Sequence, residues 1–289
     1  MNWILLSLLS AISVATKNVI TRKLSFRTDR SVILYAKYVF ASIFAVLLLL
    51  VTGIPLIEPG FYYSIFLASV IDVIASWYFI QAVASAQLAR TFPLVALTPI
   101  FLVGTSFFLL GEVPSFIGLI GIIAIVCGAY MLRSESIKVG LLEPFRLLLK
   151  EKASRNMLVA AFLFSFLAVF FKKAILNSSV YFALCITQLL AMLILSAVFV
   201  KRKTIAAIYS KIKNNFGLLF LSGFVAFIAG LTLFAAFKIG LASYVVSIKR
   251  TSILFTIILG YIFFKEDHLI RSLLIGIIMA LGILLISIG

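Results

Sequence analysis

Charged and metal-binding side chains are scarce in this 289-residue sequence. Only 12% of its residues are charged and 64% are hydrophobic, whereas soluble domains have about 25% charged and roughly 45–50% apolar residues. Its one histidine, His268, and its two cysteines, Cys127 and Cys185, lie far apart in the sequence. No spacing typical of a metal site or of a Cys-His catalytic pair is present. These scarcities argue against a soluble domain, a metal centre, a bound cofactor and an enzyme.

Long apolar runs recur along the whole chain instead. Each is about 18 or more residues long, the length of a helix that crosses a bilayer. Short segments with glycine and proline, such as 52–60 and 109–115, separate several of the runs. The sequence therefore predicts an all-α polytopic membrane protein with ten transmembrane helices at about 2–20, 31–52, 60–84, 87–110, 114–132, 156–175, 179–200, 215–237, 241–264 and 267–288.

Basic residues outnumber acidic residues by 25 to 9, which gives a formal net charge of +16. Most basic residues lie in the loops between helices 1 and 2, 5 and 6, 7 and 8, and 9 and 10, which share one face of the membrane. Positive charge marks the cytoplasmic loops of membrane proteins. The distribution therefore predicts a cytoplasmic connector at 133–155, external termini and a multi-pass protein of the plasma membrane. It indicates the lipid bilayer, and not a nucleic acid, as the partner of these charges.

The two halves of the sequence are related by a repeat. The matches pair Lys17 with Lys172 and Glu112 with Glu266. Because each half has five helices, the halves must be oppositely oriented in the bilayer, as in secondary transporters. Three pairs of segments match at an offset of 154 or 155 residues: 9–20 with 164–175, 79–89 with 233–243, and 106–132 with 260–286.

The repeat, together with the glutamate that precedes a glycine-rich helix in 109–121 and in 263–276, resembles the drug/metabolite transporter superfamily. The resemblance is to its ten-helix EamA-domain members and covers essentially the whole chain. It implies one five-helix repeat at 1–132 and a second at 156–289. Members of that superfamily carry amino acids, drugs, nucleotide sugars or phosphorylated sugars, so the resemblance implies a secondary transporter of a small metabolite.

Four charged residues lie deep in the predicted helices. Lys37 lies about seven residues, or roughly 10 Å, into helix 2. Asp72 lies near the middle of helix 3, and Lys249 and Arg250 lie within helix 9. Charges at such depth normally face the interior of the bundle and mark a substrate or ion pathway. Asp72 cannot neutralise three cations, so a cavity that they share would attract an anion. Asp72 itself either pairs with a cation or takes up a proton as the coupling group.

Helix 9 also carries hydroxyl groups near its two cations. At helical spacing, Tyr244, Ser247 and Thr251 lie on the face of Arg250, and Lys249 lies about 100° away. We predict that the guanidinium of Arg250 and the ammonium of Lys249 bind a phosphate or carboxylate. We predict that the three hydroxyls donate hydrogen bonds to the same substrate, with Lys37 as a further cation.

Prolines stand in helix 4 where helix 9 has its cations. Pro93 and Pro99 free backbone carbonyls, which membranes tolerate beside a cavity, so we predict that these prolines border the cavity. The Lys249–Arg250 pair resembles the Lys-Arg pair on the ninth helix of the plastid triose-phosphate translocators. This resemblance implies that the pair binds a phosphate.

Three functions remain open at this point. The first is alternating-access transport of a small organic anion or amphoteric metabolite. The second is export of an amino acid or drug through a pocket that Asp72 makes net neutral. The third is a lipid-headgroup flippase or a non-transporting membrane scaffold. Lys17 and Lys172, nearer the helix ends, either snorkel to the headgroups or enter the bundle. Glu112 is expected to end a helix. The sequence does not predict an oligomeric state.

Overall fold

The computed structural model describes residues 2–83, 92–133, 151–200, 215–264 and 269–289, and within these ranges it contains helices and no strand. The first half holds α1 (Asn2–Ser25), α2 (Arg30–Thr52), α3 (Gly60–Val83), the 3-10 helix η1 (Phe92–Leu97), α5 (Thr98–Leu110) and α6 (Phe116–Arg133). The second half holds α8 (Lys152–Leu176), α9 (Val180–Val200), α11 (Phe216–Ile239), α12 (Ala242–Lys249), α13 (Ser252–Phe264) and α14 (Leu269–Ile288).

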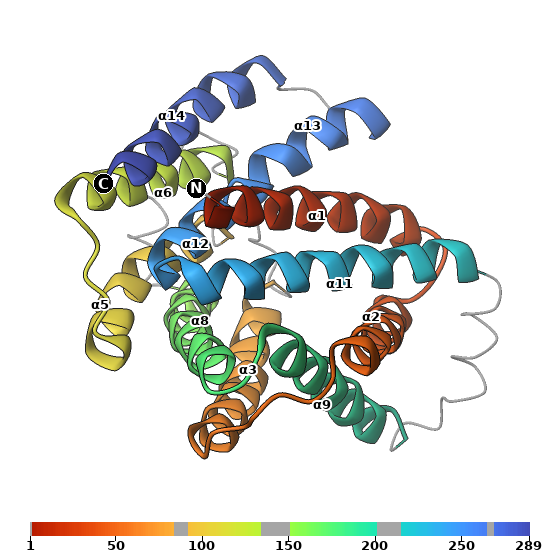
Figure 1. The fold of residues 1–289 in the computed structure, drawn as a ribbon. Helices are drawn as coiled ribbons and strands as arrows, with labels where there is room; N and C mark the ends of the chain where they lie inside the picture. Colours follow the sequence, from red (N-terminus) through yellow and green to blue (C-terminus); the bar gives the residue numbers. More distant parts are fainter. Residues whose placement is uncertain (1, 84–91, 134–150, 201–214, 265–268) are drawn as a thin grey trace.

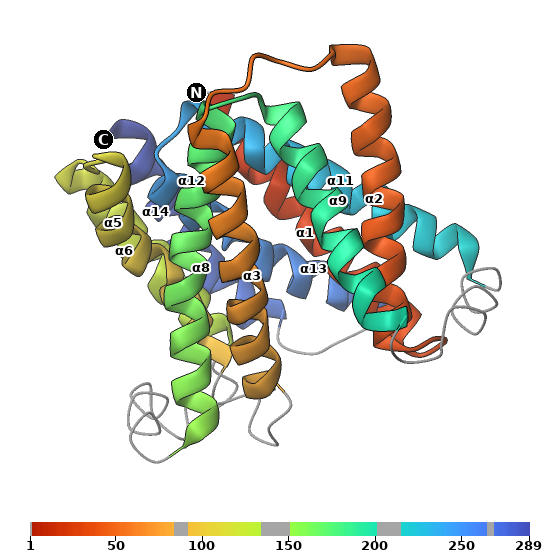
Figure 2. The ribbon, with the colours of Figure 1, turned by 90° about the horizontal axis from the view of Figure 1, so that it is seen from below.

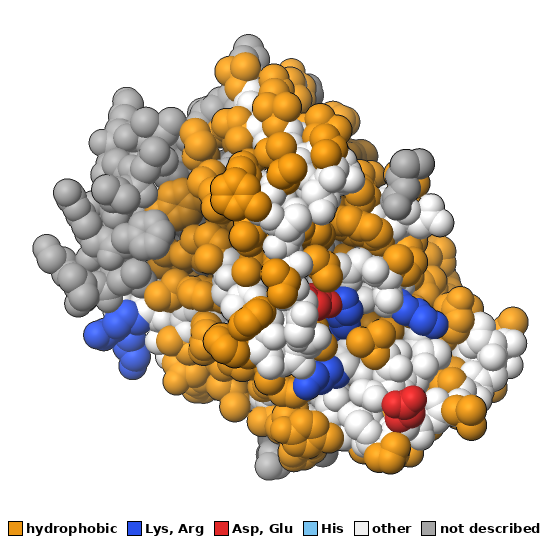
Figure 3. Space-filling model, turned by 60° about the vertical axis from the view of Figure 1, so that its left-hand side comes forward, with side chains coloured by type: hydrophobic (Ala, Val, Ile, Leu, Met, Phe, Trp, Pro, Cys, Tyr) orange, Lys and Arg blue, Asp and Glu red, His pale blue; other side chains and the backbone are white. Residues whose placement is uncertain are grey.

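The described residues confirm ten apolar spans. Seven helical stretches are long and apolar enough to cross a membrane, one of them Ala242–Phe263, which joins α12 to α13. Three shorter apolar stretches, Leu94–Leu110, Phe116–Leu132 and Leu273–Ile288, complete the set. Large hydrophobic side chains such as Phe108 (83% exposed) face outward, and hydrophobic side chains dominate the face shown in Figure 3. This surface suits lipid and not water.

Glycine ends two of the helices where the backbone leaves the conformations that other residues favour. Gly111 follows α5 with a left-handed φ of 68°, and its N–H donates to the carbonyl of Phe107. Gly53 follows α2 with a φ of 77°, and its N–H donates to the carbonyl of Leu49. A residue without a Cβ adopts these angles at little cost. Both glycines therefore stop their helices at one end of the bundle.

Each helix packs mainly against a helix of the other half. In Figure 1, α1 lies beside α11 and α6 beside α14, and in Figure 2, α3 lies beside α8 and α2 beside α9. The α3–α8 and α1–α11 pairings are equivalent under exchange of the two halves, because α8 and α11 are the sixth and eighth spans. This interleaving is what two inverted five-helix repeats produce, and it confirms the predicted architecture.

The helices α6 and α14 cross with their backbones in close contact. A Cβ built on Gly121 would lie 2.6 Å from the carbonyl oxygen of Gly282, and one built on Gly282 would lie 2.7 Å from the carbonyl oxygen of Gly121. Small residues let helix backbones approach in membranes. The crossing therefore depends on glycine at both positions.

The ninth span is broken, whereas the sequence predicts one continuous helix at 241–264. Arg250 and Thr251 form a turn between α12 and α13. The hydroxyl of Thr251 donates to the carbonyl of Ile248 at 2.7 Å, and the N–H of Thr251 bonds the same carbonyl at 3.0 Å. A hydroxyl that competes for a backbone carbonyl in this way bends a helix. The span itself agrees with the prediction, since Ala242–Phe263 is one stretch long enough to cross a membrane. The turn within it was not predicted because no proline or glycine marks it in the sequence.

Candidate transport site

The larger cavity lies where the fourth and ninth spans are broken. Its volume is about 340 Å³, within the range of small-molecule pockets. Six of the ten spans contribute to its wall, three from each half. The lining residues are Val14, Asn18, Phe79, Val95, Thr98, Phe164, Leu167, Ala168, Phe171, Leu233, Phe237, Val246, Lys249, Arg250, Ser252 and Ile253.

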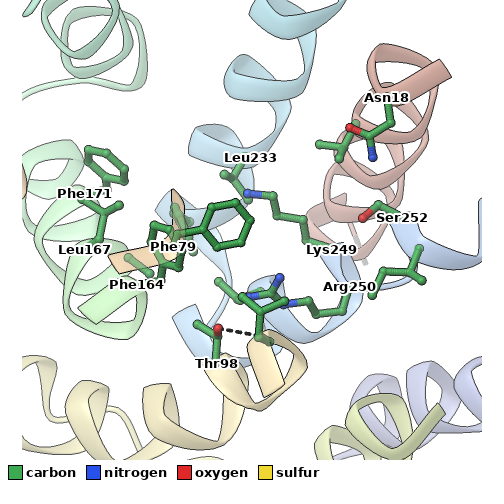
Figure 4. A pocket seen from close by; sticks show the side chains of 16 residues that line it. Asn18, Phe79, Thr98, Phe164, Leu167, Phe171, Leu233, Lys249, Arg250 and Ser252 are labelled. Carbon is green, nitrogen blue, oxygen red and sulfur yellow. Dashed lines mark hydrogen bonds between the residues drawn. The ribbon is translucent and has the colours of Figure 1, made fainter. Parts of the chain in front are cut away.

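One side of this cavity is cationic. Lys249 is the last residue of α12 and Arg250 follows it in the turn, so the break places two adjacent side chains in the wall. Figure 4 shows Lys249 reaching toward Leu233 and Arg250 toward Thr98. The Nε of Arg250 is buried and has no hydrogen-bond partner among the described residues. An unsatisfied buried N–H of a guanidinium is costly unless a ligand accepts its hydrogen bond.

Neutral polar groups surround the two cations. Asn18, Thr98 and Ser252 line the cavity from α1, α5 and α13. The Thr98 hydroxyl donates to the carbonyl of Val95 at 2.8 Å, the contact dashed in Figure 4, and its oxygen can still accept a hydrogen bond. Asn18 donates to the hydroxyl of Thr256 at 3.2 Å. These groups supply hydrogen bonds without adding charge.

The opposite side of the cavity is aromatic. Phe79, Phe164, Phe171 and Phe237 come from α3, α8 and α11, and the rings of Phe79 and Phe164 lie 6.0 Å apart at 64°. Such tilted ring pairs pack well and present an apolar surface. A ligand that fits this cavity therefore has an apolar part and a part that binds cations.

A smaller cavity of about 230 Å³ adjoins the larger one. The two share Val14, Phe171, Leu233 and Lys249 in their walls, so Lys249 faces both. The smaller cavity is the more polar one, because its remaining wall includes Lys17, Lys37, Tyr38, Asp72, Thr187 and Gln188.

The smaller cavity gathers charges of both signs. The ammonium of Lys37 lies 3.7 Å from the ring centroid of Tyr38, a cation–π contact that orients the side chain without neutralising it. Asp72 is its one carboxylate among the described lining residues, against the ammonium groups of Lys17, Lys37 and Lys249. Positive charge is thus in excess in the two adjoining cavities, as the sequence predicts.

The structure brings together only part of the predicted site. Lys37, Asp72, Lys249 and Arg250 line the cavities. Tyr244, Ser247 and Thr251 are in neither lining set and are at most 5% exposed. Their hydroxyls bond elsewhere: Ser247 donates to the carbonyl of Ser243, Thr251 donates to that of Ile248, and Tyr244 accepts the N–H of Ser115.

The two prolines mark the break in the fourth span, and Pro99 is not among the described residues that line the cavities. Pro93 lies in η1, and Pro99 is the second residue of α5, where its missing N–H would have no helical partner. Val95 and Thr98, between the prolines, line the larger cavity instead.

Several cavity residues were not predicted. Asn18 and the four phenylalanines resemble ordinary apolar-run residues in the sequence, so no local signal marks them. Lys17 does not snorkel, because it lines the smaller cavity. Its counterpart Lys172 is 7% exposed and pairs with Glu112, so snorkelling is wrong for it as well. The internal repeat pairs Lys17 with Lys172, and this pairing is the sequence feature that could have indicated a buried role for both lysines.

Known proteins provide an independent comparison. A search of curated proteins found no match. A solved structure titled "Crystal structure of protein" is similar to this chain with a TM-score of 0.73 at 10% sequence identity. The similarity covers 99% of this chain and 95% of that one. At this identity it shows the fold alone. The sequence model of the EamA-like transporter family matches residues 1–134 and 155–288. The family model matches both halves of the sequence, in agreement with the ten-span fold of two repeats. The chain therefore belongs to the EamA-like transporter family, whose members are membrane transporters and not enzymes.

Proposed function

We propose that this protein transports a small organic anion, or an amphoteric metabolite with a phosphate or carboxylate, by alternating access. The observation that carries the proposal is the pair Lys249 and Arg250, placed by a helix break in a cavity whose other side is aromatic. Cations held at this depth in a membrane protein stabilise an anionic ligand and are costly without one.

The two cations have different roles in binding the anion. Arg250 has a planar guanidinium whose Nε–H is unbonded, so it can bind two oxygens of one phosphate or carboxylate. Lys249 faces both cavities and adds a point charge from the neighbouring position. Thr98, Ser252 and Asn18 replace the hydroxyls of Tyr244, Ser247 and Thr251 as the neutral hydrogen-bonding groups. The resemblance to the triose-phosphate translocators supports a phosphate in this place.

A second candidate function is export of an amino acid or another zwitterion. Asp72 lies in the cavity that Lys249 also lines, so an ammonium group near Asp72 and a carboxylate near Arg250 are compatible with one ligand. In this case Asp72 offsets part of the positive charge and binds the ammonium group of the ligand. A flippase would bind a lipid phosphate at the same cations, and phospholipid headgroups therefore belong among the ligands to be tested.

The membrane topology belongs to the same proposal. The basic connector at 133–155 lies in the cytoplasm, between repeats at 1–132 and 156–289, and both termini lie outside the plasma membrane. The loop charges support this orientation. A reporter enzyme that works only in the cytoplasm, fused to the C-terminus, should be inactive. Activity of this fusion would contradict the proposed topology.

A thermal-shift screen of the purified protein tests the substrate class. Ligands that bind the folded protein raise its apparent stability by mass action. We expect phosphorylated sugars, nucleotide sugars or organic acids to raise the Tm, and amino acids to do so if the zwitterion function holds. Neutral sugars and organic cations serve as matched negative ligands. The anion proposal fails if only these negative ligands stabilise the protein.

A further inference from the structure

A buried network joins the two halves at the end of the bundle that holds the termini. The ammonium of Lys172 donates to one carboxylate oxygen of Glu112 and, at 2.6 Å, to the carbonyl of Gly240. The other carboxylate oxygen of Glu112 accepts the N–H of Ala242 at 2.7 Å. Glu112 is 9% exposed and Lys172 is 7% exposed. We call these four residues the terminal latch.

The latch connects directly to the helix that carries the candidate site. Ala242 is the first residue of α12 and Lys249 is the last, so the two are about 10 Å apart along the helix. Glu112 therefore places a carboxylate at the positive N-terminal end of α12, where the backbone dipole stabilises it. Because α12 is one continuous helix from Ala242 to Lys249, a rigid-body movement of its first turn would also displace Lys249.

Side chains from three spans pack closely beside the latch. The ring of Trp3 stacks on Tyr244 with 5.9 Å between centroids, and the N–H of Ser115 donates to the Tyr244 hydroxyl at 2.9 Å. A Cβ on Gly118 would lie 1.9 Å from the same hydroxyl. The first, fifth and ninth spans therefore meet closely at this end.

The opposite end of the bundle is arranged differently. In Figure 2, α3 and α9 lie close together near the termini and diverge toward the other end. Lys17, the equivalent of Lys172 in the first half, lines the smaller cavity. The two equivalent lysines are thus placed differently, with Lys172 in a buried ion pair at the terminal end and Lys17 in the wall of a cavity. Glu266, the counterpart of Glu112, lies outside the described residues.

We propose that the terminal latch is the gate of the transport pathway on the side of the termini, and that Glu112 and Lys172 are positioning residues for α12. To open this side, the ion pair must separate and its two charges must be hydrated, which frees the N-terminus of α12 and moves Lys249 and Arg250. The proposal rests on the transport activity of the family and not on the charge of the substrate.

A buried serine next to the latch allows a test that needs no substrate. Ser243 is 0% exposed and its hydroxyl has no partner among the described residues, so Ser243→Cys changes little. The background is Cys127→Ser with Cys185→Ala. The readout is the rate at which a charged, water-soluble maleimide modifies this cysteine in purified protein. Ser154→Cys is the matched reporter, because Ser154 is equally buried and unpartnered on α8, at the end of that helix remote from Lys172.

The latch variants are Lys172→Met, which removes the charge and both donated bonds, and Glu112→Gln, which keeps the shape and still accepts from Ala242. Lys173→Met, one residue along α8, is the control. We expect both latch variants to be modified at Ser243→Cys at least tenfold faster than the control, with the Ser154→Cys rate unchanged. If Lys172→Met does not fold, the modification rate of Ser243→Cys in the Glu112→Gln variant provides the test. Equal rates at Ser243→Cys in latch variants and control would overturn the proposal, as would an equal increase at Ser154→Cys.

Discussion

Thr98 and Ser252 occupy equivalent positions in the two halves, 154 residues apart, and each is the first residue after a helix break. Both line the larger cavity. The breaks have different local causes, because a 3-10 helix with Pro93 precedes Thr98 whereas a Thr251 hydroxyl bond precedes Ser252. The two breaks lie at equivalent positions although different residues cause them, which indicates that a break at this depth is needed to form the cavity. The cations of the larger cavity, Lys249 and Arg250, come from the second half alone.

Replacing Arg250 by lysine keeps the charge and removes the planar fork. We expect Arg250→Lys to fold normally and to bind the anionic ligand identified by thermal shift with about tenfold to hundredfold lower affinity. This loss corresponds to one charge-assisted hydrogen bond, about 1.5–3 kcal/mol. Isothermal titration measures it. Arg155→Lys, at an exposed position of α8, is the control and should bind as the parent does. Unchanged affinity in Arg250→Lys would show that the fork is not used.

Lys249→Ala distinguishes the two candidate substrate classes. Because Lys249 faces both cavities, its removal lowers the positive charge around any ligand. We expect affinity for an anion to fall by about tenfold or more, and affinity for a zwitterion to fall less, since Asp72 still binds the ammonium group. Competition binding with a matched pair, a carboxylic acid and its α-amino derivative, gives the ratio. A larger loss for the zwitterion contradicts the anion function.

Asp72→Asn separates ion pairing from proton coupling. If Asp72 takes up a proton during transport, the variant loses accumulation driven by a pH gradient and keeps the exchange of substrate between the two sides of proteoliposomes. If Asp72 pairs with a cation, both activities fall together because a buried positive charge loses its partner. Flux measurements with and without a gradient check this. Asp72 has neither role if both activities stay at the parental level.

Gly282→Ala should destabilise the α6–α14 crossing. Its Cβ would lie 2.7 Å from the carbonyl oxygen of Gly121, and backbone cannot yield as a side chain does. Overpacking of this kind costs about 1–3 kcal/mol, so the Tm in detergent should fall. Gly217→Ala is the matched control, because nothing lies within 4 Å of a Cβ there, and it should leave the Tm unchanged or raise it. Equal Tm values for both variants would mean that the helices separate without cost.

The sequence predicted the ten spans and the repeat because both depend on long-range composition. A run of apolar residues fixes a membrane helix, and an odd number of helices per repeat fixes the inversion. The depth of Lys249 and Arg250 in an apolar run singled them out in the sequence, and both line the larger cavity; that they bind substrate stays a prediction.

The details that depend on packing were not predictable in the same way. Ser247 and Thr251 have the right spacing for a polar face, yet a hydroxyl in an apolar helix can bond its own backbone, and here both do. Whether Lys172 snorkels or pairs depends on the distance to Glu112, which the chain brings close only through the fold. The aromatic wall is invisible in a sequence with 28 phenylalanines.

Counterflow in proteoliposomes tests the central claim, that Lys249 and Arg250 bind the transported anion. The labelled compound is the anion that most strongly stabilises the purified protein. We predict that the parent and Arg155→Ala accelerate its uptake, whereas folded protein carrying both Lys249→Ala and Arg250→Ala gives the rate of empty liposomes. Parental counterflow by the double variant, or acceleration by the parent of neutral and cationic compounds alone, would contradict the account.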